Sequence, residues 1–280
     1  MPELAEVEFY RKQWNPGLGR RVSRVLVHPR ARVFRGEHPA RLVRQLMGAT
    51  LRSSYAAAKQ MLFQFDHGRW RRPHRGWLGV HLGMSGELRT AAHGYVPQKH
   101  DHLVLRQGEW CLVFSDPRMF GRITFSVGHQ PPAWWTRLAP PVLSAAFTGE
   151  AVAAFLKRHG RAPIKAVLLQ QERFPGIGNW MADEILWRAA IHPRRTAGSL
   201  TAAETRHVWR ECRRVCRQAL DAIVGRGDDA PSALNERIPD SWLFHHRWED
   251  GGRCPITGAR LKREVIGGRT TCWSPARQKI

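Results

Sequence analysis

Short runs of apolar residues dominate the first half of the chain, from about residue 22 to residue 126. Glycine, proline and charged residues separate these runs, which is the pattern expected for β-strands joined by turns. The clearest runs cover residues 77–82, 102–105, 110–114 and 122–125. We expect an antiparallel β-sandwich or barrel in this part of the chain.

The apolar spacing becomes helical after a proline-rich segment at residues 128–143, which we interpret as a linker. Thr148 is placed to cap a helix that stops near Gly160. Thr201 and Glu204 form a capping box ahead of a long helix that closes at Gly225. These signals predict a helical second half.

The pattern as a whole predicts an α+β fold with two domains. The N-terminal β domain covers residues 1–127, and the helical domain covers residues 144–280. Within the second domain, residues from about 250 to 280 contain β-branched positions on both sides of Gly267 and Gly268, which predicts a β-hairpin.

The positive net charge of the chain indicates that its binding partner is a polyanion. The net charge is +22 and the pI is about 11.3, and Lys and Arg number 45 against 23 Asp and Glu. Such a field favours nucleic acid and salt-dependent binding. GC-rich codon usage would explain the excess of arginine equally well.

Localisation and redox state are also indicated by the sequence. No apolar run approaches the roughly 18 residues that a membrane span needs, and the N-terminus has no signal-peptide pattern, so we expect a soluble intracellular protein. The five cysteines are odd in number, which favours reduced thiols.

The first residues of the chain could provide a reactive amine. Removal of Met1 would leave Pro2 as a secondary amine that titrates near pH ~8 and can attack a sugar carbon. Glu3 and Glu6 are close enough in sequence to transfer protons. The alternative is an ordinary amphipathic helix that begins near Leu4 with acidic residues in its first turn.

Three turns carry further candidates. The Gly176-Ile177-Gly178 turn precedes a helix, with Asn179 as its expected N-cap, so that backbone amides would be open to a phosphate. A plain helix connection is the alternative. Met84, on a glycine-flanked turn, is either a core residue or an apolar wedge that enters the DNA base stack.

A second possible wedge is Phe120, with the cation Arg118 beside it. A simple strand-entry turn fits residues 116–121 as well.

Six short motifs occur in a fixed order over nearly the whole chain: MPELAEVE, HLGMSG, KHDH, DPRMFG, GIGNWMADE and GGRTT. In this order they closely resemble the formamidopyrimidine-DNA glycosylase and endonuclease VIII family. The resemblance implies an N-terminal β-sandwich, a helix-two-turn-helix domain and a DNA-binding hairpin. It also implies that the damaged base is flipped out of the duplex into a pocket.

The resemblance assigns roles position by position. Pro2 would be the nucleophile at C1′ of the damaged nucleotide, Glu3 the acid/base group acting on the deoxyribose, and Glu6 a second acid near the pocket. Lys59 is counted as catalytic and, like several other positions, as a phosphate contact. The remaining DNA-binding positions are His81, His100, Asn179 and Arg269, and the residues that fill the gap left by the flipped base are Met84, Arg118 and Phe120.

Departures from the family pattern begin with Ala5, Met119 and Gln170. We expect Ala5, in place of a proline, to be tolerated, and the sequence does not decide the effect of the other two.

The zinc-finger positions depart further. A zinc finger needs two Cys-x-x-Cys pairs, but the four positions hold Cys254, Thr257, Ser274 and Arg277, while Cys272 lies out of register. We therefore expect no metal, and a hairpin held by packing through Trp273 and Leu261. Together with residues 240–248, this ending resembles the zincless plant and fungal branch.

The function implied is a bifunctional DNA glycosylase and AP lyase of base excision repair, which acts without cofactor through a Schiff base with β,δ-elimination. Ring-opened formamidopyrimidines and hydantoins are better substrate candidates than 8-oxoguanine. The alternatives are an endonuclease VIII-like preference for oxidised pyrimidines or abasic sites, a catalytically silent DNA-damage binder, and an architectural protein. The expected partner is damaged double-stranded DNA, without a membrane. We expect a monomer, cytoplasmic at the nucleoid in a bacterium or nuclear in a eukaryote.

Overall fold

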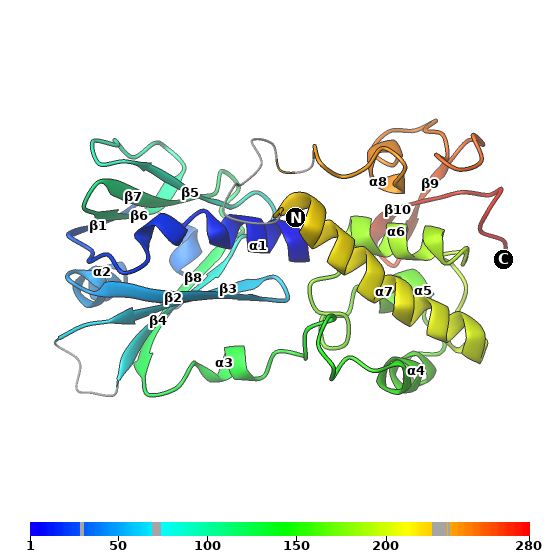
Figure 1. Ribbon diagram of the computed structural model, residues 1–280, viewed down its shortest axis with the longest axis horizontal. Helices are drawn as coiled ribbons and strands as arrows, with labels where there is room; N and C mark the ends of the chain where they lie inside the picture. The colour runs from blue at the N-terminus through cyan, green and yellow to red at the C-terminus, as the bar shows by residue number, and fades with distance from the viewer. Residues whose placement is uncertain (29–30, 69–73, 226–233, 235) are drawn as a thin grey trace. The chain divides into compact units, whose positions relative to one another are not determined.

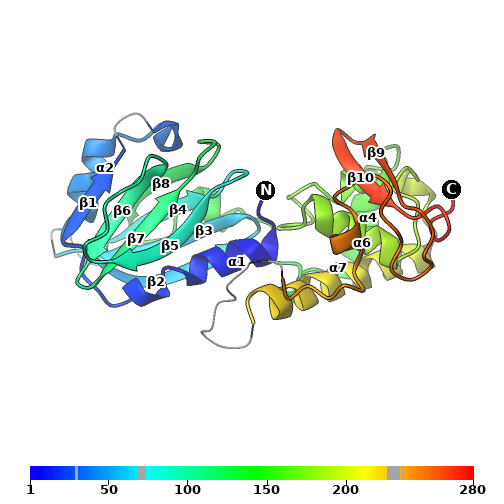
Figure 2. The same ribbon diagram turned by 90° about the horizontal axis from the view of Figure 1, so that it is seen from above.

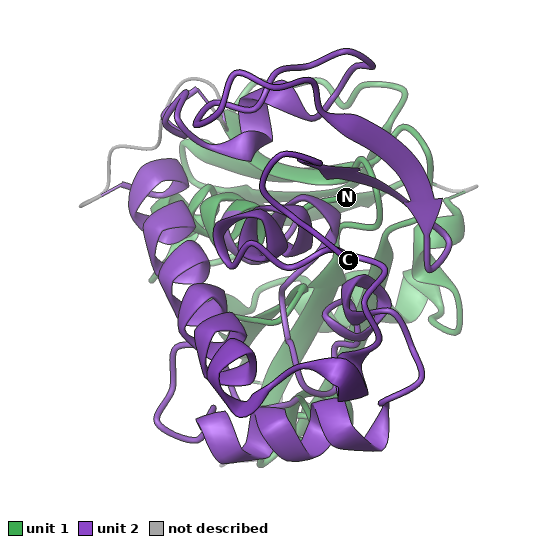
Figure 3. Ribbon diagram, turned by 90° about the vertical axis from the view of Figure 1, so that its right-hand side faces the viewer, with its two compact units in different colours: residues 1–2, 6–138 green, residues 3–5, 139–280 purple. Residues whose placement is uncertain are grey.

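The computed structural model describes residues 1–28, 31–68, 74–225, 234 and 236–280 (Figure 1). The chain divides into two compact units. Unit 1 contains Met1–Pro2 and Glu6–Leu138, and unit 2 contains Glu3–Ala5 and Ala139–Ile280 (Figure 3). The boundary after Leu138 falls inside the proline-rich segment.

Unit 1 is built on two four-stranded antiparallel sheets. One sheet has the order β1-β6-β7-β5 and the other has the order β2-β3-β4-β8. The strands are β1 (Arg24–Val27), β2 (Thr50–Ala57), β3 (Gln60–Asp66), β4 (Arg75–His81), β5 (Glu87–Ala92), β6 (Asp101–Gln107), β7 (Trp110–Ser115) and β8 (Arg122–Gly128). The predicted antiparallel sandwich and its four clearest strands are confirmed.

The core of unit 1 joins the two sheets. Phe63 from one sheet and Phe114 from the other belong to one buried cluster. Trp14 is fully buried there, with its ring centroid 4.7 Å from that of Phe63 and its Nε1 donating to the Val113 carbonyl at 3.3 Å. Trp14 follows helix α1 (Leu4–Lys12), which begins where the sequence predicts.

Short helices complete unit 1. They are η1 (Asn15–Gly17), η2 (Arg32–Phe34), α2 (Pro39–Leu46) and α3 (Ala133–Thr136). Helix α3 lies within the segment predicted as a linker, and its Trp134 packs on β4. A Cβ atom at Gly79 would lie 2.5 Å from the Trp134 ring, so this contact requires glycine.

Unit 2 consists of helices and one hairpin. The elements are α4 (Gly149–Arg158), α5 (Ile164–Val167), α6 (Asn179–Arg188), η3 (Ala197–Ser199), α7 (Ala202–Ile223), α8 (Leu243–His246), β9 (Lys262–Ile266) and β10 (Arg269–Trp273). Helix α6 packs against α7 and also against β10 (Figure 2). Among the described residues, no helix is both long enough and apolar enough to cross a bilayer.

The predicted caps and turn of unit 2 are present. The Thr148 side chain accepts from the Ala151 amide at 3.2 Å, and Thr201 and Glu204 form the reciprocal capping box of α7. Gly267 and Gly268 have φ angles of 59° and 75°, which a two-residue hairpin turn with positive φ requires.

Candidate active site

Glu3 caps helix α6 from a distant part of the sequence. Its Oε2 accepts hydrogen bonds from the amides of Gly178 (2.8 Å) and Met181 (3.1 Å), and its Oε1 accepts from the Trp180 amide (2.9 Å). The side chain is 2% exposed. A carboxylate here satisfies amides that have no partner within the helix and complements the helix dipole.

This contact corrects two expectations. Asn179 is the first residue of α6 rather than its N-cap, which is Gly178. The amides expected to be open to a phosphate are occupied by the Glu3 carboxylate. A Cβ atom at Gly178 would lie 2.3 Å from Glu3 Cδ, so the glycine serves the approach of a side chain.

Asn179 instead links α6 to the hairpin. Its Nδ2 donates to the Thr270 carbonyl at 2.8 Å. Its Oδ1 is buried and has no hydrogen-bond partner among the described residues. Arg269, next to Thr270, is exposed at the start of β10. Two predicted DNA-binding residues are therefore brought close together.

A buried ion cluster fixes the hairpin behind these residues. Asp183, fully buried on α6, pairs with Lys165 and with Arg247, whose Nη2 lies 2.6 Å from Oδ2. The same Oδ2 accepts from the Cys272 amide of β10 at 3.0 Å. Burial lowers the pKa of Lys165, and Asp183 opposes that effect. Sequence reasoning missed this cluster, although a lone lysine in the apolar run 163–168 was a usable signal.

The positions of the family's zinc ligands do not fit a metal site. Arg277 donates from Nε to the Trp187 carbonyl at 2.8 Å and from Nη2 to the Arg188 carbonyl at 3.2 Å. Within the described part of the chain, no group of three or more His, Cys, Asp or Glu residues gathers to hold a metal. Only Cys254 is a thiol at the four expected positions, and a single thiolate does not make a structural zinc site.

Packing and hydrogen bonds hold this region instead. Cys254 and Leu261 belong to a buried cluster with Trp187, Leu243 and Cys272. Burial raises the pKa of Cys254, but hydrogen bonds from Thr257, Trp187 and Ile256 outweigh that effect and lower it to about 7.

Trp273 packs away from that cluster. Its ring lies 4.2 Å from that of His192, and its Nε1 donates to Glu264 at 2.8 Å.

In unit 1, the β2–β3 turn and the end of β4 bring two predicted residues together. Lys59 follows Ala58, which has a positive φ of 56°, and precedes Gln60, the register partner of His81. Burial lowers the pKa of His81, and the nearby Lys59 charge lowers it further. The Gly83 amide donates to His81 Nδ1 at 3.0 Å, which leaves Nε2 to carry the proton of the neutral ring.

The N-terminal candidates differ in exposure. Pro2 is half-buried and is bonded to Glu3. Glu6 is 4% exposed within α1. Burial raises the pKa of Tyr10 to about 12, with further contributions from Glu87 and Glu6.

Asp116 organises the two turns that carry the wedge candidates. Its Oδ1 accepts from Ser85 Oγ (2.7 Å) and from the Arg118 amide (3.2 Å), and its Oδ2 accepts from the Gly121 amide (2.7 Å). The side chain is fully buried. A Cβ atom at Gly83 would lie 2.5 Å from the backbone of the other turn. The two turns thus form one closely packed unit.

The side chains predicted to act as wedges project from this unit. Met84 is 43% exposed and Phe120 is 51% exposed, and the Arg118 guanidinium carbon lies 5.0 Å from the centre of the Phe120 ring. The predicted DNA-binding residue His100 contacts this unit through its backbone, since its carbonyl accepts from the Asp116 amide at 3.0 Å. Met119, one of the departures, has a φ of 52° and packs against the core, so it does not join the exposed side chains.

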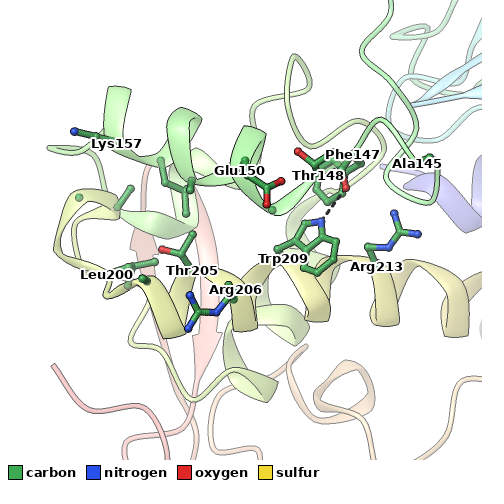
Figure 4. A pocket seen from close by; sticks show the side chains of 16 residues that line it. Ala145, Phe147, Thr148, Glu150, Lys157, Leu200, Thr205, Arg206, Trp209 and Arg213 are labelled. Carbon is green, nitrogen blue, oxygen red and sulfur yellow. Dashed lines mark hydrogen bonds between the residues drawn. The ribbon is translucent and has the colours of Figure 1, made fainter.

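Each unit contains a cavity. The cavity in unit 1, of about 720 Å³, is lined in part by His81, Phe120 and Arg122. The cavity in unit 2, of about 830 Å³, lies between α4 and α7 and contains none of the predicted site residues (Figure 4).

Unit 2 therefore has a glutamate that caps α6 and follows Pro2 in the sequence, with an asparagine and an arginine at its hairpin. Unit 1 has exposed apolar side chains on a closely packed pair of turns. Two family models match the chain: Formamidopyrimidine-DNA glycosylase N-terminal domain at residues 1–123, and Formamidopyrimidine-DNA glycosylase H2TH domain at residues 138–227. Together they define the class as a DNA glycosylase of base excision repair.

Curated relatives support the same conclusion over the full length. The formamidopyrimidine-DNA glycosylase of Alkalilimnicola ehrlichii is 34% identical, with 100% of both chains covered. That of Geobacter metallireducens is 35% identical, with 98% of both covered. The chain belongs to the formamidopyrimidine-DNA glycosylase family.

Solved structures agree on the fold. The wild-type Lactococcus lactis protein in complex with DNA containing an oxidised pyrimidine has a TM-score of 0.85, with 23% identity and 100% of both chains covered. A structure of the Lactococcus lactis protein in complex with DNA that contains an abasic site has a TM-score of 0.84 and 23% identity. This match covers 99% of the present chain and 100% of the Lactococcus lactis chain.

Proposed function

We propose that this glycosylase is bifunctional, with Pro2 as the nucleophile that removes the base and then cleaves the strand. The observation that carries the proposal is the position of Glu3. Three amides hold its carboxylate at the start of α6, and Pro2 is the adjacent residue. An acid/base group held in this way next to a terminal amine is suited to covalent catalysis at a sugar carbon.

With Met1 removed, the Pro2 amine forms a bond to C1′, the glycosidic bond breaks, and the base leaves with its electron pair and takes up a proton. The amine then loses its N–H proton as the C1′–O4′ bond breaks, O4′ takes up a proton, and an iminium ion forms. Loss of a proton from C2′ expels the 3′ phosphate, and loss of a further proton from the sugar expels the 5′ phosphate. Water hydrolyses the remaining imine and frees the Pro2 amine. Glu3 would transfer the proton at the deoxyribose oxygen.

In this proposal, both buried and exposed residues contact the DNA. Lys59, His81, Asn179 and Arg269 would bind phosphates, which positions the strand without reading its sequence. Met84, Arg118 and Phe120 would occupy the space left by the extruded base. His100 supports the second of these turns through its backbone, and Glu6 would act near the base pocket.

We propose ring-opened purines and hydantoins as the preferred lesions. The reason is that only Cys254 remains of the four zinc-ligand cysteines, which makes the hairpin region resemble the zincless plant and fungal branch of the family. An oxidised-pyrimidine or abasic-site preference is the second candidate, and a solved relative in complex with oxidised-pyrimidine DNA favours it. The relatives are bacterial, and we propose that the protein acts as a monomer on chromosomal DNA in the cytoplasm.

A panel of lesion duplexes tests this function. Duplexes with ring-opened guanine, a hydantoin, 8-oxoguanine, thymine glycol or an abasic site are incubated with the enzyme, and the strand ends are analysed. We expect fastest cleavage at the first two lesions, with phosphate on both sides of the gap. Free base without strand scission would contradict the lyase step, and faster cleavage at thymine glycol would support the second candidate. Binding without release of any base would identify a catalytically silent protein.

A further inference from the structure

Helix α7 carries a row of arginines on its outer face. Arg206, Arg210, Arg214 and Arg217 are all exposed. They follow one another at intervals of four, four and three residues, which places them on one side of a helix. The buried residues of α7, including Val208, Cys212, Val215 and Ala219, lie on the opposite side.

Acidic side chains balance this row only in part, and Asp221, one turn after Arg217, is the exposed acidic residue on the same face. Glu204 is used in the capping box and pairs with Arg195. Glu211, 7% exposed, lies 3.6 Å from Arg214. Among the described residues, Arg206, Arg210 and Arg217 form no ion pair within 4.0 Å. Like charges one turn apart destabilise a helix, so the row opposes the stability of α7.

The neighbouring Arg213 shows what a structural arginine on this helix does. Its Nη1 donates to the carbonyls of Val142 (3.0 Å) and Ser144 (2.8 Å), and its Nη2 donates to that of Leu143 (3.2 Å). Figure 4 shows Arg213 turned toward the loop that precedes α4. The four arginines of the outer face make no such contacts in the described part of the chain.

The outer face also lies apart from the DNA-binding candidates of unit 2. Helix α6 packs against α7 on one side and against β10 on the other (Figures 2 and 3). Asn179 begins α6, and Arg269 begins β10. Because the buried side of α7 faces this packing, the four arginines lie on the side of α7 that is turned away from α6.

We propose that this face binds the phosphate backbone of a second segment of duplex DNA, separate from the segment that carries the lesion. Arg206 and Arg217 are about 16 Å apart along the helix axis at 1.5 Å per residue. This length covers about five phosphates of one strand at 3.4 Å each. Guanidinium groups bind phosphates in bidentate fashion, which suits arginine for the role. The enzyme would then hold two DNA segments and transfer between them during search.

The stoichiometry of DNA binding tests the proposal. A short undamaged duplex is added in excess at low salt, and complexes are resolved by sedimentation velocity. Wild-type protein should form complexes with two duplexes. The variant R206Q/R210Q/R214Q/R217Q should bind only one duplex. The salt-dependent binding of a second duplex, seen with the wild type, should be absent. A matched variant, R24Q/R41Q/R44Q/R161Q, removes the same charge from exposed positions elsewhere and should still bind two.

Thermal melting shows that the first variant is folded, and its Tm should equal or exceed that of the wild type because repulsion is removed. A wild-type protein that binds only one duplex would overturn the proposal. So would a first variant that still binds two. Anionic lipid vesicles are the alternative ligand that would distinguish the two proteins. If such vesicles bind the wild type but not this variant, and no second duplex binds, the arginine face binds an anionic membrane surface and the proposal is wrong.

Discussion

The Glu3 carboxylate accepts a hydrogen bond from the Gly178 amide at 2.8 Å, although 175 residues separate them. The contact orients a residue next to the proposed nucleophile by means of a helix N-terminus. It also explains two features of the GIGN turn, since the turn must expose amides and must have no side chain at position 178. The catalytic role proposed for Glu3 and the stability of α6 are therefore linked.

Replacing Gly178 with alanine should displace the Glu3 carboxylate. We expect excision of a damaged base to fall by at least tenfold and stability to fall by about 1–3 kcal/mol, as for other overpacked sites. Excision rates and chemical denaturation measure the two effects. Gly94→Ala is the control, because a Cβ atom there meets nothing within 4 Å. Full activity in Gly178→Ala would exclude the proposed role of this contact.

Asp116→Asn should loosen the turns that carry Met84 and Phe120. One oxygen acceptor becomes an N–H group that faces the Ser85 hydroxyl or a backbone amide, at a cost of about 1–3 kcal/mol. Excision of an intact lesion should slow more than cleavage of a preformed abasic site, which has no base to extrude. The exposed Asp66→Asn, which breaks a surface pair with Arg52, should change neither rate. Equal slowing of both reactions would mean a purely structural role.

The capping box of α7 should give acid sensitivity. Hydrogen bonds from Arg195, opposed by burial and aided by Thr201, lower the pKa of Glu204 from 4.5 to about 2. A depressed pKa in the folded state contributes stability above pH 4.5, and this contribution is lost as the pH falls toward about 2. The Tm of wild type should therefore drop more steeply across this range than that of Glu204→Gln. Parallel Tm profiles would show that Glu204 does not contribute to the acid sensitivity.

Arg269→Ala should weaken DNA binding without regard to sequence. Losing one phosphate contact should reduce the slope of log affinity against log salt by about 0.9. Fluorescence anisotropy at several salt concentrations gives the slope. Arg253→Ala removes an exposed arginine that donates to the Gly258 carbonyl and should leave the slope unchanged. An unchanged slope in Arg269→Ala would place Arg269 outside the DNA contact.

Local patterns predicted most of the fold, because strand alternation, the Thr148 and Thr201 caps and the Gly267-Gly268 turn depend on near neighbours in the sequence. Asn179 was misassigned for the same reason: asparagine is a common N-cap residue, but the N-cap position is Gly178 and the amides are bound by the Glu3 side chain from a distant part of the sequence. The joining roles of Asp116 and Asp183 depend on contacts between distant segments. No periodicity in the sequence reports such contacts.

Borohydride trapping followed by peptide mapping shows whether Pro2 is the nucleophile. The enzyme is incubated with a lesion duplex, the imine is reduced, and the adduct is digested and analysed by mass spectrometry. We expect a nucleotide fragment attached to the nitrogen of Pro2 in a peptide that lacks Met1. An adduct on any lysine, or active protein that retains Met1, would contradict it.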